Sequence, residues 1–317
     1  MKLALGGDLS DETLQFAKQL GVGHLVAHGL PDSGRGYWEF IDLLRAKKRL
    51  EMQGLELAVL GLPQDHYWNV VLGRPERDQE IENVCRSIQG MGQAGIPVLA
   101  YSFMFAGVWG HWRGYGSGGG RGDAGIKSFD YDLVKDAPLT SAGEVSGDEM
   151  WARFTYFLER IVPVAEEAGV RLACHPHDPP VPVLRGETRI LGTVEGLKRL
   201  VETVPSPSNG LNFCQGTVAE MGVDVIEVIR YFGERDKINT VHFRNVRGTV
   251  PKFDEVFIDE GDVDMFKAMQ TYKEVGYERT MIPDHTPRVV GDSSRGHRGR
   301  AFALGYMRAL MQVVGSL

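Results

Sequence analysis

Eight short apolar runs, separated by eight amphipathic segments, constrain the fold of this chain more than any other feature of its sequence. Each run has the length and composition of a buried strand, and each intervening segment repeats apolar residues at helical spacing. The apolar runs fall at 3–8, 24–29, 55–63, 97–104, 170–175, 209–214, 238–243 and 279–284. The helices that we expect cover 10–20, 37–53, 76–94, 148–168, 194–204, 219–232, 263–275 and 299–314. This alternation predicts an α/β fold, a (β/α)8 TIM barrel.

The length of the chain fits one such barrel. A TIM barrel takes roughly 250 residues plus insertions, so we expect the 317 residues, 1–317, to form a single domain. The surplus lies in a Gly-rich insertion at about 109–139, directly after the fourth strand and on the face that carries active-site loops in barrel enzymes. Two interpretations of the insertion stay open here, a lid over the site or a disordered excursion.

Charge and composition exclude several classes of partner. The net charge of -7 and the lack of a dense Lys/Arg run argue against nucleic acid. No apolar stretch approaches the ~20 residues that span a bilayer, so we expect no membrane partner. The first 16 residues, MKLALGGDLSDETLQF, turn acidic too soon for a secretory signal, and we expect a cytoplasmic protein. An odd number of cysteines, three, indicates reduced thiols.

The last four apolar runs each end on a residue that can bind a metal. These residues are His175, Cys214, His242 and Asp284. Each one alone is more often a core or packing residue, but their shared position at consecutive strand ends favours a single site. Two imidazoles, a thiolate and a carboxylate suit divalent Mn, Fe or Zn better than Ca or Mg. The sequence therefore predicts a divalent metal site at the carboxyl ends of the strands.

Strand alternation adds further polar residues to this site, because residues two apart on a strand share a face. Asn212 then points inward with Cys214, and Arg244 with His242. We expect His177, Asp178, Arg244 and His285 to line a pocket above the metal, with Asn212 beside them. For Arg244 two interpretations stay open: its planar fork could hold a substrate carboxylate, or it could form a structural ion pair in the barrel mouth.

Several motifs, in order along the chain, resemble the mannonate dehydratase family. They are CHPHDPP (174–180), GLNFCQGTVAEMG (210–222), VHFRNV (241–246), DEGDVDM (259–265), PDHTP (283–287) and the longer segment 72–104. The resemblance implies a xylose-isomerase-like TIM barrel whose metal is held by His175, Cys214, His242 and Asp284. It implies Mn(II) first, with Fe(II) or Zn(II) as alternatives, a small-molecule sugar acid as substrate, and a homo-oligomer.

The family reaction that the resemblance implies is the metal-dependent dehydration of D-mannonate to 2-keto-3-deoxygluconate. His285 matches the family's catalytic histidine. The family's catalytic tyrosine is missing, because alignment of SSRGHRGRAFALGYMRAL (293–310) places His297 or Arg298 at its position. A neutral imidazole can act as a base near pH 7 and a guanidinium cannot, so we expect His297 to take that role.

The lost tyrosine keeps two other functions open. One is a metal-dependent isomerase or epimerase of a sugar or keto-sugar on the same scaffold, which would retain the 3-hydroxyl. The other is a non-catalytic homologue that binds a sugar acid without turning it over.

Overall fold

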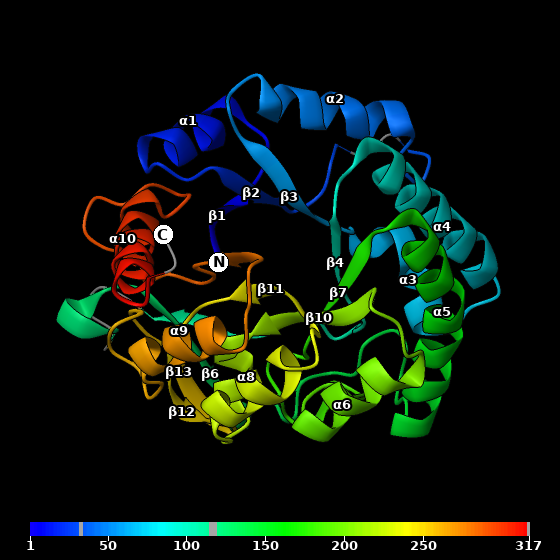
Figure 1. Cartoon of the computed structure of the whole chain (residues 1–317). Coiled ribbons are helices and arrows are strands. Elements are labelled where there is room, and N and C mark those ends of the chain that lie inside the picture. Colours follow the sequence, from blue (N-terminus) through cyan, green and yellow to red (C-terminus); the bar gives the residue numbers. More distant parts are fainter. Residues whose placement is uncertain (32–33, 114–118, 316–317) are drawn as a thin grey trace.

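Eight parallel strands close into a barrel in the computed structural model, which describes residues 1–31, 34–113 and 119–315. Around the barrel the strands follow the order β1, β14, β11, β10, β7, β4, β3, β2, and helices surround them on the outside (Figure 1). The barrel strands are β1 (Lys2–Gly7), β2 (His24–Ala27), β3 (Glu56–Gly61), β4 (Val98–Ser102), β7 (Arg171–His175), β10 (Asn209–Cys214), β11 (Ile238–His242) and β14 (Thr280–Ile282). All eight strands fall within the predicted runs or within one residue of them, and the predicted (β/α)8 barrel is confirmed.

The helices begin and end where the sequence supplies capping residues. Ser146 accepts a hydrogen bond from the backbone of Glu149 in a capping box at the start of α5, and Gly169 ends that helix with φ 67°. The longer helices are α1 (Asp11–Gln19), α2 (Phe40–Glu51), α4 (Arg77–Ala94), α5 (Gly147–Ala168), α6 (Val194–Thr203), α8 (Val225–Gly233), α9 (Met265–Glu274) and α10 (His297–Val313). The shorter elements are η1 (Gln64–Tyr67), α3 (Trp68–Leu72) and α7 (Gln215–Glu220).

One predicted helix is divided in the structure. The sequence pattern predicted a continuous helix over 219–232, but α7 ends at Glu220 and α8 begins at Val225. Gly222 between them has φ 74°, and Asp224 caps α8 by accepting from the backbone N–H groups of Ile226 and Glu227. A left-handed glycine followed by a capping aspartate stops one helix and starts the next. The break leaves Glu220 at the barrel mouth.

The insertion after β4 forms strands at the residues that the structure describes. Its strands β5 (His111–Arg113) and β6 (Ile126–Asp130) pair antiparallel, and β6 also pairs with β13 (Lys252–Glu255), which pairs with β12 (Val246–Thr249). The result is a four-stranded sheet outside the barrel, near α9 in Figure 1. The 3-10 turns η2 (Arg121–Asp123) and η3 (Tyr131–Leu133) and the hairpin of β8 (Val183–Leu184) and β9 (Glu187–Thr188) complete the loops. A single domain over 1–317 stays a prediction.

Two apolar layers hold the barrel together. Small aliphatic side chains fill its interior, among them Ala4, Val26, Ala58 and Ala173, while the larger apolar residues pack between the strands and the surrounding helices. Bulky residues are thus excluded from the narrow centre, as in other packed eight-stranded barrels. Among the helices in the described part of the chain, none is long and apolar enough to cross a membrane.

Two helical glycines provide a matched test of the packing between α4 and α5. A Cβ at Gly92 in α4 would overlap the backbone carbonyl oxygen of Ala168 at the end of α5, whereas a Cβ at Gly305 in α10 would meet nothing within 4 Å. We expect Gly92→Ala to lower the free energy of unfolding by about 1 to 3 kcal/mol and Gly305→Ala to raise it by about 0.5 to 1 kcal/mol. Urea titration monitored by circular dichroism measures both changes, and equal behaviour of the two variants would contradict the close packing.

Candidate metal centre and active site

Three of the four predicted metal ligands meet at the carboxyl end of the barrel. His175, Cys214 and His242 are the last residues of β7, β10 and β11, which are neighbours in the barrel. Their ligand atoms all lie within 4.8 Å of one another. That spacing is close to the spacing of donors around one ion when each donor lies about 2.0 to 2.3 Å from the ion. These three residues could therefore hold one divalent cation.

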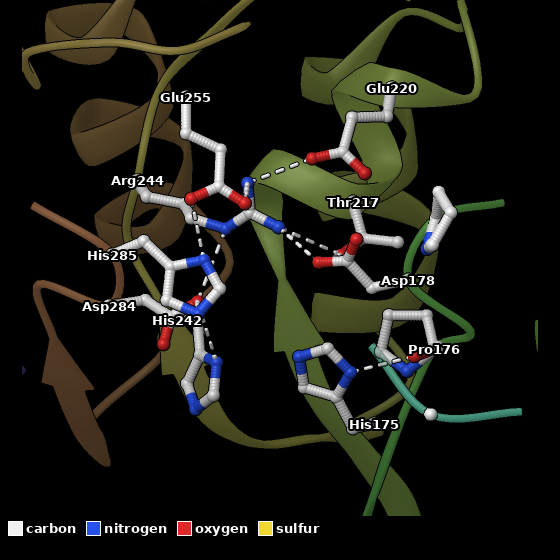
Figure 2. A network of polar contacts seen from close by, with 12 residues as sticks. His175, Pro176, Asp178, Thr217, Glu220, His242, Arg244, Glu255, Asp284 and His285 are labelled. Carbon is white, nitrogen blue, oxygen red and sulfur yellow. Dashed lines mark hydrogen bonds and ion pairs between the residues drawn. The ribbon is translucent and has the colours of Figure 1, made fainter. Parts of the chain in front are cut away.

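The ring of His175 is oriented for metal binding. Its Nδ1 donates to the backbone carbonyl oxygen of Pro176 at 2.7 Å, a contact drawn in Figure 2. Since Nδ1 carries the proton, Nε2 is the nitrogen left to bind a metal. A backbone acceptor of this kind fixes the tautomer of many metal-binding histidines.

Asp284, the fourth predicted ligand, lies beside this group. It follows β14 by two residues, and its Oδ2 is 3.4 Å from Nδ1 of His242 and 3.2 Å from Nε of Arg244. In the structure its carboxylate is thus shared between a ligand histidine and a buried arginine. Asp284 thus contacts the three clustered residues through His242.

Electrostatics make the centre attractive to positive charge. Burial alone would raise the pKa of Cys214, but Arg244 and His175 hold it well below its usual value. Burial likewise opposes ionisation of Asp284, yet His242 and His285 keep its pKa well below the usual range. Burial would lower the pKa of His242, but Asp284 and Cys214 raise it to about 10. The thiolate and the carboxylate thus favour a cation between them, which is the charge that a divalent metal supplies.

Arg244 lies buried among carboxylates, which favours the ion-pair interpretation over contact with a substrate carboxylate. Its guanidinium is 2% exposed and lies at the centre of Figure 2. Its nitrogens lie 2.5 Å from Oδ2 of Asp178, 2.8 Å from Oε1 of Glu220 and 3.7 Å from Oε1 of Glu255, besides Asp284. With four carboxylates around it, the planar fork has no free edge for a ligand. The ion-pair interpretation of Arg244 is the one that the structure supports.

The acidic residues around Arg244 form a buried cluster. The carboxylates of Asp178, Glu220 and Glu255 lie within 4.8 Å of one another, but Arg244 already supplies their positive charge. Burial and the nearby Asp178 raise the pKa of Glu220 well above its usual value, and Arg244 opposes that shift. Oδ2 of Asp178 accepts from Arg244 and from the hydroxyl of Thr217, and its contact with substrate stays a prediction.

His285 is the partly exposed member of this network. Its Nδ1 lies 2.7 Å from Oε2 of Glu255, and its Nε2 lies 3.9 Å from Oδ2 of Asp284. Burial would lower the pKa of His285, but Asp284 and Glu255 raise it. About a third of the side chain is open to solvent, so His285 can exchange protons with a molecule at the barrel mouth.

The other two predicted pocket residues have structural contacts. His177 is fully buried, and its Nε2 lies 2.8 Å from the carbonyl oxygen of Phe103, so its role in substrate binding stays a prediction. Nδ2 of Asn212 on β10 lies 3.0 Å from Nε2 of His242 on β11. Asn212 thus contacts a candidate metal ligand, and its role in substrate binding stays a prediction.

His297 is not brought together with these residues. It begins α10, its ring packs on Phe16 of α1 with 4.3 Å between the ring centroids, and its Nε2 lies 3.8 Å from Oε1 of Glu12. Its described contacts are thus with α1 rather than with the metal centre.

Sequence reasoning missed Glu220, Glu255 and Arg300. The two acids lie on elements that the pattern did not resolve, the end of α7 and the strand β13. Arg300 on α10 donates from Nη1 to the carbonyl oxygen of Gly6 at 2.7 Å. Burial lowers the pKa of Arg300, and the charge of Asp284 offsets part of that shift. His28 was missed as well, although it directly follows Ala27, the last residue of β2.

Sequence comparison places these residues in a known family. The family model described as D-mannonate dehydratase (UxuA) matches residues 6–137 and 136–316. The mannonate dehydratase of Thermotoga maritima is 30% identical over an alignment that covers 88% of this chain and 87% of that protein. Mannonate dehydratase 2 of Halalkalibacterium halodurans is 28% identical, with 96% of both chains covered.

Structural comparison agrees with the sequence. The crystal structure of mannonate dehydratase from Streptococcus suis serotype 2 has a TM-score of 0.88 at 29% identity and covers 99% of this chain and 96% of that chain. A xylose isomerase domain protein from Planctomyces limnophilus has a TM-score of 0.64 at 14% identity, covers 99% of both chains and shares the fold. The barrel is thus xylose-isomerase-like, and the chain belongs to the D-mannonate dehydratase family.

Proposed function

We propose that this chain is a metal-dependent hydro-lyase that dehydrates a sugar acid, D-mannonate, to 2-keto-3-deoxygluconate. The observation that carries this proposal is the convergence of His175, Cys214 and His242 within 4.8 Å, in a chain of the D-mannonate dehydratase family. Asp284 and His285 beside them add a fourth ligand and a proton-transfer group.

We assign the metal to His175, Cys214, His242 and Asp284. The mixed nitrogen, sulfur and oxygen set favours a divalent transition metal, and we propose Mn(II), with Fe(II) or Zn(II) as alternatives. Such a cation would stabilise the negative charge that develops on the substrate when the proton beside its carboxylate is removed.

His285 is the proposed acid. The carboxylates of Asp284 and Glu255 favour its protonated form, and its exposed edge allows the ring to give a proton to the departing 3-hydroxyl. The second proton transfer needs a base. We propose His297 for this role, because it aligns with the position of the missing tyrosine. To act on a substrate at the metal centre, the His297 ring would have to leave its contact with Phe16.

With Arg244 fully engaged, we propose Arg300 as the cation that holds the substrate carboxylate. Arg300 is partly buried, and the charge of Asp284 offsets part of the lowering of its pKa by burial. A Cβ at Gly6 would lie 3.8 Å from His28, so Arg300 and His28 flank the same strand end.

The substrate is then the main partner, a small-molecule sugar acid. A homo-oligomer and a cytoplasmic location stay predictions.

The function is tested by assaying metal-stripped and Mn-reloaded protein on D-mannonate and measuring the 2-keto-3-deoxy product. We expect product only after reloading, because the metal stabilises the developing charge. Cys214→Ala should lose bound metal, measured by mass spectrometry, together with the activity. Cys174→Ala is the matched control, since Cys174 is buried on the neighbouring strand β7 but belongs to the core.

Each outcome has a distinct meaning. Metal binding without turnover of mannonate, but with conversion of a ketose, would replace the dehydratase by the isomerase or epimerase. Binding of mannonate without any turnover would indicate the non-catalytic homologue. The same assay on His297→Asn decides the base, because a catalytic His297 requires a large loss of kcat.

Arg300→Ala should raise KM for D-mannonate about 10- to 100-fold, because a hydrogen bond to a charged group contributes about 1.5 to 3 kcal/mol. Arg308→Ala is the control. Arg308 lies on the same helix and also donates to backbone carbonyl oxygens, those of Leu20 and Gly21, away from the metal centre. An unchanged KM in Arg300→Ala, measured by steady-state kinetics, would exclude Arg300 as the carboxylate ligand.

A further inference from the structure

Glu255 enters the active site from outside the barrel. It is the last residue of β13, where it pairs with Val246 of β12 on one side and with Lys127 of β6 on the other. Strands on both sides fix its backbone, and its side chain is about 5% exposed. The sheet that includes the insertion therefore delivers a buried carboxylate to the barrel mouth.

The two oxygens of Glu255 have different neighbours. Oε2 lies 2.7 Å from Nδ1 of His285, while Oε1 lies 3.7 Å from Nη1 of Arg244. Because Arg244 constrains one oxygen, the other stays directed at the imidazole. In Figure 2 the His285 ring lies between the carboxylates of Glu255 and Asp284.

This contact determines which nitrogen of His285 is free. With Nδ1 against Glu255, Nε2 is turned to the side of Asp284 and the metal ligands. A histidine that acts as an acid must present one defined nitrogen to its substrate, and a carboxylate on the other nitrogen is the usual means of fixing the ring. Without Glu255 the ring could rotate about its side-chain bonds and present either edge.

We propose that Glu255 is a positioning residue that holds His285 with Nε2 toward the substrate, and that the sheet formed with the insertion keeps Glu255 in place. The inference rests on the proposed function of His285 as the acid. The insertion then contributes to catalysis as a scaffold, through β6 and β13.

Glu220 offers a matched control for the test. It is also buried and also contacts Arg244, at 2.8 Å, but no contact between Glu220 and His285 is recorded among the described residues. Loss of either acid changes the surroundings of Arg244, whereas only loss of Glu255 should release the His285 ring. Glu255→Gln keeps the size of the side chain and an oxygen that can accept from Nδ1.

The first readout needs no turnover. In protein labelled with 15N in its histidine rings, the His285 signals are identified by their absence in His285→Asn. We expect the Nδ1-bound proton of His285 to be visible in the wild type and in Glu220→Gln, largely kept in Glu255→Gln, and lost in Glu255→Ala. An unchanged His285 signal in Glu255→Ala would overturn the proposal.

The second readout is kinetic. Glu255→Ala should lower kcat on D-mannonate about 10- to 100-fold with little change in KM, and Glu255→Gln should recover most of the loss. In the His285→Asn background, Glu255→Ala should lower kcat no further, because both residues act through the same imidazole ring. A full further loss there would overturn the positioning role. Absence of turnover in the wild type would instead contradict the proposed function, and the ring signals alone would then decide the role of Glu255.

Discussion

The buried guanidinium of Arg244 is the interaction on which the rest of the site depends. It joins four segments that are distant in sequence, through Asp178 after β7, Glu220 at the end of α7, Glu255 on β13 and Asp284 after β14. Four carboxylates brought this close would repel one another and resist burial without a cation among them. Arg244 supplies positive charge at the centre of this cluster, with contacts to all four carboxylates.

The candidate metal ligands and the proposed acid lie next to the ion pairs of Arg244. Asp284 divides its Oδ2 between Arg244 and the ligand His242, and Glu255 divides its two oxygens between Arg244 and His285. Each of these two carboxylates therefore contacts both Arg244 and a histidine. In this way one buried cation fixes the positions of both the metal ligands and the proposed acid.

The sequence predicted the barrel and the meeting of three candidate metal ligands because both follow from local patterns. Apolar runs predict strands, and His175, Cys214 and His242 each stand at the end of such a run, where the carboxyl end of the strand is expected. The sequence could not decide between the two roles of Arg244, because the side of a strand on which a charged residue lies does not reveal its partners. Glu255 became recognisable only once the insertion was seen to pair with β13, a contact between residues more than a hundred positions apart.

Replacement of Arg244 tests the account most directly. We expect Arg244→Met to lower the free energy of unfolding by about 3 to 5 kcal/mol, since it leaves buried carboxylates without their cation. The folded fraction should also bind Mn(II) more weakly, as measured by calorimetric titration, because Asp284 loses its fixed position. An Arg244→Met protein with the stability and the Mn(II) affinity of the wild type would contradict the claim that this guanidinium organises the site.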